Sequence, residues 1–404
     1  MKDTSPTLES DALAWILGLP DSADFVARDL GKSWVHAKNE DRARFADLLS
    51  LGQLDEILGT YGVKHPTVRL VRADQDVPVS EYVWREQMVD PVQAARLFAE
   101  GSTVIFGALH DRHEGMRRLS AELARQATAR TQTNIYLTPP DSQGFKPHWD
   151  THDVFVLQVE GSKRWRIYAG GPETPLKDHK FDPERHEPGD VEAEFTLEAG
   201  ETLYIPRGIM HAAVTTDDVS LHITLGLIAY TWADFVADCL SEVADRSAAW
   251  RANVPFGLAT RDPDGHATAA RLDEMLTGLA SEVDLPKVIA ERQRSFESLF
   301  RPRVADLLRQ AAGATEVHAD DRVQWRTGMT GWLEQRNGRV VLTSGTREVD
   351  FPAAATRTLE TLLEAKAMRA GELDDGLDWD SRRVVLSTLV REGYVGVESA
   401  GASR

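Results

Sequence analysis

The sequence predicts an α+β fold in which a strand-rich central region lies between helical regions. Two observations indicate this. Short alternating or apolar runs separated by glycine turns fill residues 131–230, as in a small antiparallel barrel. Apolar residues three and four positions apart recur on both sides of that stretch, as in amphipathic helices. We expect four parts: a mainly helical N-terminal part packed on the barrel over 1–100, the barrel over 101–230, a helical region over 231–312 and a mixed domain over 313–404.

The N-terminal part carries mostly helical signals. Helices are predicted over residues 13–18, 42–48, 54–58 and 91–99. Gly101 follows the last of these, and glycine is a common residue just beyond a helix end. Strands are predicted over 68–72 and 103–106, and a further helix over 115–129.

The central region contains two β-rich runs within 153–168, joined by a turn at Gly161. A second turn at Gly200 precedes a short apolar strand, which ends at Pro206 because proline cannot donate to a sheet ladder. Short strands of this kind suit a small antiparallel barrel. The mouth of such a barrel is a natural ligand site.

Helical spacing returns after the barrel. It is clearest over residues 232–240, 272–279 and 288–308. Pro255, Pro263 and Gly265 mark breaks between these helices. The spacing leaves two arrangements open: the helices form a homodimer interface, or they pack only on their own barrel.

The tail combines strands over 340–343 and 348–351 with a helix over 353–365, then a second helix and a strand within 380–397. This succession resembles a winged helix. Winged helices often bind DNA, but acidic residues here leave little basic surface for phosphates. We therefore interpret the domain as a protein-interaction or structural wing. The acidic residues are Glu360, Glu364, Glu372, Asp374, Asp375, Asp378 and Asp380.

Composition narrows the partners. The 404-residue chain has a formal net charge of −18, which repels phosphate backbones and attracts basic polypeptides, so direct nucleic-acid binding is not expected. A single cysteine, Cys239, excludes an intrachain disulfide and fits a reducing cytoplasm. No apolar stretch is long enough to span a bilayer and the first residues lack a signal-peptide pattern, so no membrane association is expected.

A candidate metal site combines His148 and Asp150 with the later His211. If the first two residues lie on a strand, its period of two puts both side chains on one face, and His211 from an antiparallel strand can complete a triangle. Two imidazoles and one carboxylate with open positions suit non-heme Fe(II). A lone His-X-Asp pair is weak evidence, because such pairs also occur in loops without a metal.

Further motifs surround these three residues in the middle third of the chain. They are NIYLTPP over 134–140, SQGF over 142–145, HWD over 148–150, VFVLQVEGSKRW over 154–165, LYIPRG over 203–208 with His211, and SLHIT over 220–224. In order and spacing these motifs resemble those of the JmjC oxygenases of the cupin superfamily, and most closely those of the ribosomal-oxygenase branch, which hydroxylates ribosomal proteins. This resemblance strengthens the metal-site interpretation.

The resemblance implies a double-stranded β-helix (jelly-roll) barrel, flanking helices, a helical dimerisation region and the C-terminal winged-helix-like domain. It also implies Fe(II), with 2-oxoglutarate and O2 as cosubstrates. In that pattern the iron is held by His148, Asp150 and His211, the distal carboxylate of 2-oxoglutarate pairs with Lys163, and further cosubstrate contacts come from Asn134, Tyr136, Ser220 and Thr224.

Alternatives stay open for the cosubstrate residues. Lys163 is otherwise an exposed hairpin lysine, although a buried cation facing an anionic cosubstrate is physically reasonable. The alternation around Asn134 and Tyr136 is that of any half-buried strand. Ser220 and Thr224 are otherwise core hydroxyls bonded to backbone.

Five further histidines are not expected to bind the metal. His152 has the strand parity to face it, but is interpreted as a pocket-lining or structural residue. His110 and His113 precede the helix over 115–129 and are expected to be solvated. His179 and His186 fall in a proline- and charge-rich insert over 170–190, which we expect to be a surface lid.

The resemblance therefore implies an oxidative hydroxylase that acts on an arginine or histidine side chain of a ribosomal protein. Two other enzymatic substrates are a small ribosomally made peptide and a modified tRNA base, of which the acidic charge disfavours the second. A non-catalytic metal-binding cupin module is the alternative of a different class, because fold alone does not assign activity.

Overall fold

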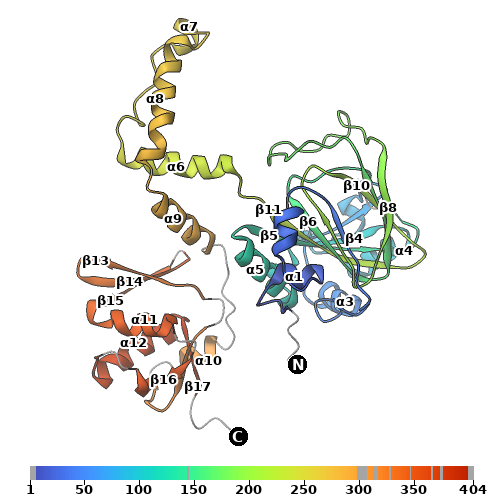
Figure 1. The fold of residues 1–404 in the computed structure, drawn as a ribbon. Helices are drawn as coiled ribbons and strands as arrows, with labels where there is room; N and C mark the ends of the chain where they lie inside the picture. Colours follow the sequence, from blue (N-terminus) through green and yellow to red (C-terminus); the bar gives the residue numbers. More distant parts are fainter. Residues whose placement is uncertain are drawn as a thin grey trace. The chain divides into compact units, whose positions relative to one another are not determined.

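The computed structural model describes residues 6–142, 145–297, 307–312, 317–326, 329–345, 347–364, 367–373 and 376–398. The chain forms two compact units, Met1–Thr231 and Trp232–Arg404 (Figure 1). The boundary falls where the sequence predicts the barrel to end. None of the described helices is both long and apolar enough to cross a bilayer.

The first unit contains five α-helices among its described residues: α1 (Ala12–Leu17), α2 (Ala23–Arg28), α3 (Leu51–Thr60), α4 (Pro91–Ala99) and α5 (Glu114–Ala127). Local signals set several helix ends. Asp11 caps α1, which stops at Gly18 in the left-handed conformation. Ser50 and Gln53 form a capping box at α3. Asp90 caps α4 immediately before its first-turn proline.

Eleven strands among the described residues of the same unit form two antiparallel sheets. Eight strands follow the order β1-β9-β6-β11-β5-β4-β2-β3, and three follow the order β10-β7-β8. The larger sheet contains β1 (Val35–Ala37), β2 (Val68–Arg72), β3 (Gln75–Asp76), β4 (Thr103–Gly107), β5 (Arg130–Thr138), β6 (Asp153–Glu160), β9 (Thr202–Ile205) and β11 (Ser220–Ile228). The smaller sheet contains β7 (Ser162–Tyr168), β8 (Val191–Glu198) and β10 (Met210–Thr215).

The two sheets pack face to face. Val154 and Val156 of the larger sheet share one buried cluster with Trp165 and Ile167 of the smaller sheet. A second, larger cluster joins the outer face of the eight-stranded sheet to the N-terminal helices, through residues such as Ile16. The predicted α+β fold with a jelly-roll barrel is therefore confirmed, and the N-terminal part also extends the larger sheet.

One N-terminal helix prediction is wrong. Residues 42–48 form successive turns rather than an α-helix, with hydrogen bonds that span three residues, such as Ala46 N–H to the Ala43 carbonyl at 2.9 Å. The side chain of Asp41 accepts the N–H of Ala43 at 3.0 Å. Such a side-chain bond favours a turn over a continuous helix.

The second unit begins with helices. They are α6 (Trp232–Arg246), α7 (Leu258–Arg261), α8 (His266–Glu282), α9 (Leu285–Glu297) and α10 (Leu307–Ala312). The predicted breaks at Pro255, Pro263 and Gly265 fall between α6 and α8, as expected. The helix predicted over 288–308 matches α9 up to residue 297, and residues 298–306 lie outside the described part of the chain.

The rest of the second unit is a mixed domain with its own buried core. Its helices are α11 (Thr356–Glu364) and α12 (Trp379–Arg391). One three-stranded sheet has the order β16-β12-β17 and the other the order β13-β14-β15. The strands are β12 (Arg322–Trp325), β13 (Trp332–Arg336), β14 (Arg339–Ser344), β15 (Arg347–Pro352), β16 (Met368–Arg369) and β17 (Val395–Glu398). The predicted helix–strand succession is confirmed here, whereas two of the acidic residues, Asp374 and Asp375, lie outside the described part.

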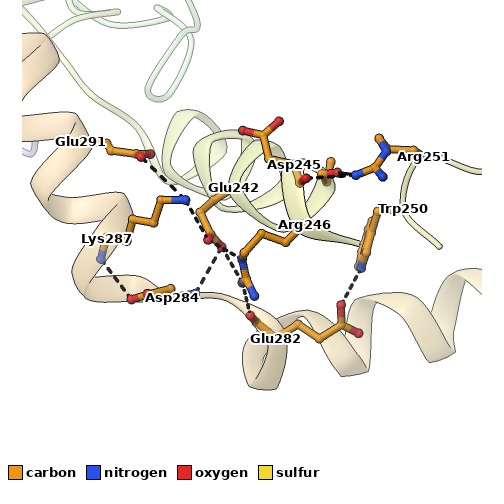
Figure 2. A network of polar contacts seen from close by, with 10 residues as sticks. Glu242, Asp245, Arg246, Trp250, Arg251, Glu282, Asp284, Lys287 and Glu291 are labelled. Atoms are coloured by element: carbon orange, nitrogen blue, oxygen red, sulfur yellow. Dashed lines mark hydrogen bonds and ion pairs between the residues drawn. The ribbon is translucent and has the colours of Figure 1, made fainter. Parts of the chain in front are cut away.

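A buried carboxylate joins α6 to the connection between α8 and α9 (Figure 2). The side chain of Glu242, only 1% exposed, pairs with Arg246 at 2.7 Å and with Lys287 at 3.5 Å. It also accepts the N–H of Asp284 at 3.3 Å. These partners, above all the hydrogen bond from Arg246, lower the pKa of Glu242 to about 2. The charged form therefore stabilises this helical junction.

We expect Glu242→Gln to lower the unfolding midpoint of the full chain by several degrees at pH 7, because two cations lose their shared carboxylate. The folded-state pKa lies below the unfolded value, so the carboxylate stabilises above pH 4.5 and ceases to do so as the pH falls towards 2. The gap between variant and wild type should close over that range. The control is Glu274→Gln, which removes a carboxylate that is 71% exposed. Equal midpoints for the two variants would contradict the prediction.

Candidate metal centre

Side chains from two segments that are distant in the sequence meet inside the barrel, His148 and Asp150 from one and His211 from the other. The candidate ligand atoms of His148, Asp150 and His211 all lie within 4.8 Å of one another. The Nε2 atom of His211 is 3.8 Å from Oδ2 of Asp150, and the two imidazole centroids are 4.7 Å apart. Among the described residues, this is the group of three acidic, histidine or cysteine side chains that is arranged to hold an ion.

The backbone brings the two histidines together. His211 is the second residue of β10, and an isolated bridge links it to His148. The N–H of His148 donates to the His211 carbonyl at 3.1 Å, and the reverse bond is 2.8 Å long. His148 and Asp150 do not lie on a regular strand, because the described part of their segment makes this single bridge. Pro147 lacks an N–H, and the Asp150 carbonyl accepts the N–H of Gly208 at 2.9 Å in a loop contact instead.

Backbone carbonyls orient both imidazoles. Nδ1 of His148 lies 2.8 Å from the Lys146 carbonyl, and Nδ1 of His211 lies 2.9 Å from the Ile209 carbonyl. A carbonyl oxygen can only accept, so each Nδ1 carries the proton. The lone pair of each Nε2 is then available to a metal, and this arrangement is common for histidine ligands.

Burial sets the charge of the neighbouring groups. It lowers the pKa of His211 to about 4, with a further contribution from His148, so that the ring is neutral near pH 7. Burial also raises the pKa of Tyr136 to about 12, and the nearby Asp150 carboxylate adds to this shift. Tyr136 therefore stays a neutral phenol that can donate one hydrogen bond.

The three residues help to line a pocket between the sheets. Polar and aromatic side chains converge on it from strands that are separated in the sequence. The other lining residues are Thr103, Tyr136, Phe145, Val154, Val156, Lys163, Trp165, Ala212, Ala213, His222 and Thr224. Such a concave site with a few convergent polar groups is typical of a small-molecule site.

Lys163 supplies a buried cation to this pocket. It lies on β7 and is 5% exposed, so it is not an exposed hairpin lysine. Its Nζ donates to Oγ1 of Thr138 at 3.0 Å, and Oγ1 of Thr103 lies 3.2 Å from the same oxygen. Burial lowers the pKa of Lys163 to about 7. An anion bound beside the ammonium would offset this cost and favour the charged form.

Two buried nitrogen atoms of the pocket lack a protein partner. They are Nδ1 of His222 and Nε1 of Trp165. His222 stacks on Tyr136, with ring centroids 4.9 Å apart and planes 8° apart. Burial, together with the charge on Lys163, lowers the pKa of His222 well below its usual value. Buried polar atoms without partners are rare in folded proteins, and a bound polar ligand is one ordinary explanation.

The structure brings together six of the eight residues expected from the sequence. Besides the three candidate metal ligands and Lys163, the pocket lining includes Tyr136 and Thr224. Asn134 pairs with Thr224 across β5 and β11 but does not line the pocket. The hydroxyl of Ser220 is buried and accepts the Gln158 amide at 2.8 Å, so it has a core partner.

Thr103, Thr138 and Trp165 are among the contributors that sequence reasoning missed. Thr138 shares strand parity with Tyr136, and Trp165 shares it with Lys163, so alternation along β5 and β7 was an available signal. No comparable signal exists for Thr103. It reaches the site only because β4 pairs with β5.

The remaining histidines have structural partners. His152 lies 3.3 Å from the Gln132 amide nitrogen and does not line the pocket. His110 and His113 are partly exposed, in line with the expectation that they are solvated, and both also have protein partners. His110 Nδ1 lies 3.0 Å from Oγ1 of Thr133, and His113 caps α5 by accepting the N–H of Met116.

The insert over 170–190 is not only a surface feature. Its backbone has no regular helix or strand, as expected of a loop, and His179 is exposed. However, the ring of His186 packs against Trp149 at a centroid distance of 4.4 Å. The insert therefore contacts the residue between the two candidate ligands His148 and Asp150.

A jelly-roll barrel with two histidines and an aspartate in its mouth defines a cupin-type protein, and the chain matches the JmjC domain family over residues 110–235. These residues include all three candidate ligands. Residues 110–235 therefore match a JmjC domain, and parts of the chain are similar to ribosomal oxygenases.

Two curated relatives illustrate this similarity. The bifunctional lysine-specific demethylase and histidyl-hydroxylase NO66 of Culex quinquefasciatus is 30% identical over 296 residues, which are 70% of this chain and 45% of the relative. Ribosomal oxygenase 2 of Bos taurus is 35% identical over 173 residues, which are 41% of this chain and 37% of the relative. The chain thus spans less than half the length of these relatives.

A solved structure shares the fold over almost the whole chain. YcfD, a ribosomal oxygenase from Escherichia coli whose structure was determined with cobalt and 2-oxoglutarate, aligns with a TM-score of 0.52 and 19% identity. The alignment covers 93% of this chain and 98% of YcfD. At this identity the likeness concerns the fold.

Proposed function

We propose that the protein is an Fe(II)- and 2-oxoglutarate-dependent hydroxylase. One observation carries the proposal: the His148, Asp150 and His211 triad lies in the same barrel pocket as the buried cation Lys163. When bound, iron with 2-oxoglutarate and O2 would supply the oxidation of an unactivated C–H bond to an alcohol, one oxygen atom of O2 entering the alcohol and the other entering succinate as CO2 is released. The chain's own residues hold, orient and shield these groups.

The donor set fits the metal. Two neutral imidazoles and one carboxylate leave positions open for further ligands, which is the arrangement found in non-heme Fe(II) oxygenases. His148 and His211 would each offer Nε2, because their Nδ1 atoms are bonded to backbone carbonyls. Asp150 would contribute the single negative charge of the triad.

The rest of the pocket fits a dicarboxylate. Lys163 would pair with the distal carboxylate of 2-oxoglutarate, with Thr138 keeping the ammonium in position. Tyr136 and Thr224 line the same pocket, and their hydroxyls could donate to a bound cosubstrate. We keep Asn134 and Ser220 as weaker candidates for cosubstrate contacts, because neither lines the pocket.

For the substrate, we infer an arginine or histidine side chain of a ribosomal protein. The names of the relatives support this, since they include histidyl-hydroxylases and ribosomal oxygenases. The net charge of −18 also favours a basic polypeptide, because opposite charge speeds and stabilises encounter. A small peptide is the second candidate. The same negative charge disfavours a modified tRNA base. The presence of the complete triad together with Lys163 disfavours a non-catalytic cupin module.

The proposal is tested by incubating ribosomal proteins with the enzyme, Fe(II) and 2-oxoglutarate, then measuring masses. We expect one protein to gain one oxygen atom, and fragmentation to assign it to an arginine or histidine. The His211→Ala variant should give no gain. A wild-type enzyme that converts no 2-oxoglutarate in the presence of these proteins would contradict the function, whereas a mass gain on RNA would replace the substrate.

We further propose a cytoplasmic location, because the chain has a single cysteine, the buried Cys239, and so forms no intrachain disulfide.

We also propose a homodimer through the helices of the second unit. These helices expose large apolar side chains, including Leu276 at 50% and Ile289 at 56%. Contiguous exposed apolar surface commonly marks an interface. Light scattering of the full chain at micromolar concentration should give twice the chain mass.

The charged variants Leu276→Glu and Ile289→Glu, combined in one chain, should shift that dimer towards the monomer. The control is Val92→Glu, which adds the same charge at a residue that is 71% exposed in the first unit. A wild-type chain that scatters as a monomer would contradict the dimer. It would leave the oxygenase proposal intact, since all proposed ligands lie in one barrel.

A further inference from the structure

The insert between β7 and β8 contacts both segments that carry the candidate metal ligands. One segment contains His148 and Asp150, and the other leads from Gly208 to His211. Most of the insert is exposed, but the rings of Phe181 and His186 and the backbone at Gly171 and His179 contact these segments. The contacts are more specific than a surface lid requires.

The first contact centres on Trp149, the residue between the two ligands of the first segment. Its indole is 5% exposed although it lies outside both sheets. Its Nε1 donates to the carbonyl of His179 at 3.3 Å. Its ring packs edge-on against Phe181 at 5.0 Å and against His186 at 4.4 Å. The insert thus covers and hydrogen-bonds the side chain next to each ligand.

The second contact reaches a ligand directly. The ring of Phe181 lies 6.5 Å from the imidazole of His148, at an angle of 62°. The same ring also contacts Trp149. The His148 ring is thus held by two contacts, the hydrogen bond from its Nδ1 to the Lys146 carbonyl and the packing of Phe181.

The third contact lies at the base of the insert. The two ends are joined by hydrogen bonds between Ala169 and the residues Gly189 and Asp190, each 3.0 Å long. A Cβ atom on Gly171 would lie 1.8 Å from the Gly208 carbonyl oxygen, so the two backbones touch. Gly208 in turn donates to the Asp150 carbonyl.

We propose that this insert is a clamp that positions the metal ligands, in which Phe181 of the insert and Trp149 of the ligand segment are the positioning residues. The proposal rests on the triad being the metal site of the proposed function. The clamp acts through packing: it holds the two ligand segments in one arrangement before the metal binds. The loss of such outer contacts typically weakens metal affinity about 10- to 100-fold.

The test measures Mn(II) affinity, with Mn(II) as a redox-stable substitute for Fe(II) and the electron paramagnetic resonance of free Mn(II) as the readout. We expect Phe181→Ala to raise the dissociation constant about tenfold or more. The control is Phe98→Ala, which removes a similarly half-buried ring that packs on the core of the N-terminal part. This control should bind Mn(II) as the wild type does. Equal affinity of Phe181→Ala and wild type overturns the clamp.

Two further variants separate the clamp from general destabilisation. Trp149→Phe keeps an aromatic ring but removes the hydrogen bond to His179, so it should weaken Mn(II) binding less than Phe181→Ala does. Gly171→Ala should weaken it by separating the insert from Gly208. Its control is Gly59→Ala, where a Cβ meets nothing within 4 Å. Wild-type Mn(II) affinity in both Trp149→Phe and Gly171→Ala also overturns the clamp. A wild-type protein that binds no Mn(II) overturns the metal site itself.

Discussion

Asp150→Ala is expected to abolish 2-oxoglutarate turnover while the fold is retained. Asp150 provides the only negative charge of the triad, so its loss leaves a dication with two neutral ligands. We expect the rate of succinate formation to fall at least about a hundredfold, because removing a ligand costs more than removing an outer contact. His148→Ala and His211→Ala should behave in the same way.

The control is Asp217→Ala, an exposed aspartate in the turn between β10 and β11. It should leave turnover unchanged. Circular dichroism and the unfolding midpoint confirm that the variants are folded. Wild-type succinate formation by a folded Asp150→Ala protein would show that the triad is not the metal site.

Lys163→Ala is expected to raise the 2-oxoglutarate concentration needed for half-maximal turnover. A charge-assisted hydrogen bond is worth about 1.5–3 kcal/mol, which corresponds to roughly a ten- to hundredfold increase. Mn(II) affinity should change much less, since Lys163 contacts Thr138 and not the triad. Lys163→Arg should retain part of the function, and Lys64→Ala, at an exposed lysine, should retain all of it. An unchanged 2-oxoglutarate requirement in Lys163→Ala would remove this residue from the cosubstrate site.

The pH dependence of the same constant is a second test of Lys163. Burial lowers its pKa to about 7, so without a ligand the ammonium loses its proton as the pH rises above 7. The half-saturating concentration of 2-oxoglutarate should therefore rise between pH 7 and pH 9 in the wild type. Lys163→Arg should show no such rise, because a guanidinium stays protonated. Parallel pH profiles for the two proteins would contradict the assignment.

The same shift affects stability. The folded-state pKa lies below the value of about 10.5 in the unfolded chain, so the unfolded chain binds more protons between pH 7 and 10.5. Relative to Lys163→Met, the ligand-free wild type should therefore gain stability as the pH rises through this range. A saturating dicarboxylate should reduce the gain, because it stabilises the ammonium. Denaturant titrations at several pH values measure both effects.

Local sequence patterns were sufficient for most secondary structure. The alternation along β5 and β7 and the helical spacing of α6 arise from burial on one face, which leaves a periodic record in the chain. Residues 42–48 had helical spacing but form turns, because the Asp41 side chain bonds to the local backbone. Such competition between side chain and backbone leaves no periodic signal.

The triad residues and Lys163 were predictable because the family motifs keep them at characteristic spacings. Their surroundings were not. Thr103 joins the pocket through the pairing of β4 with β5, and the unpaired nitrogens of His222 and Trp165 are apparent only once neighbouring strands enclose them. Hydrogen-bond satisfaction depends on all neighbours in space, so a single strand's sequence does not reveal it.

The sequence alone determined the α+β class, the order of helices and strands and the candidate ligands, since these depend on residue type and spacing within short segments. Only the tertiary structure decided that one backbone bridge joins His148 to His211, that Lys163 is buried, and that the insert over 170–190 packs on Trp149. These features depend on contacts between segments up to 63 positions apart. Many distant segments have similar local sequence patterns, and tertiary packing decides which of them come into contact. Local periodicity does not show this choice.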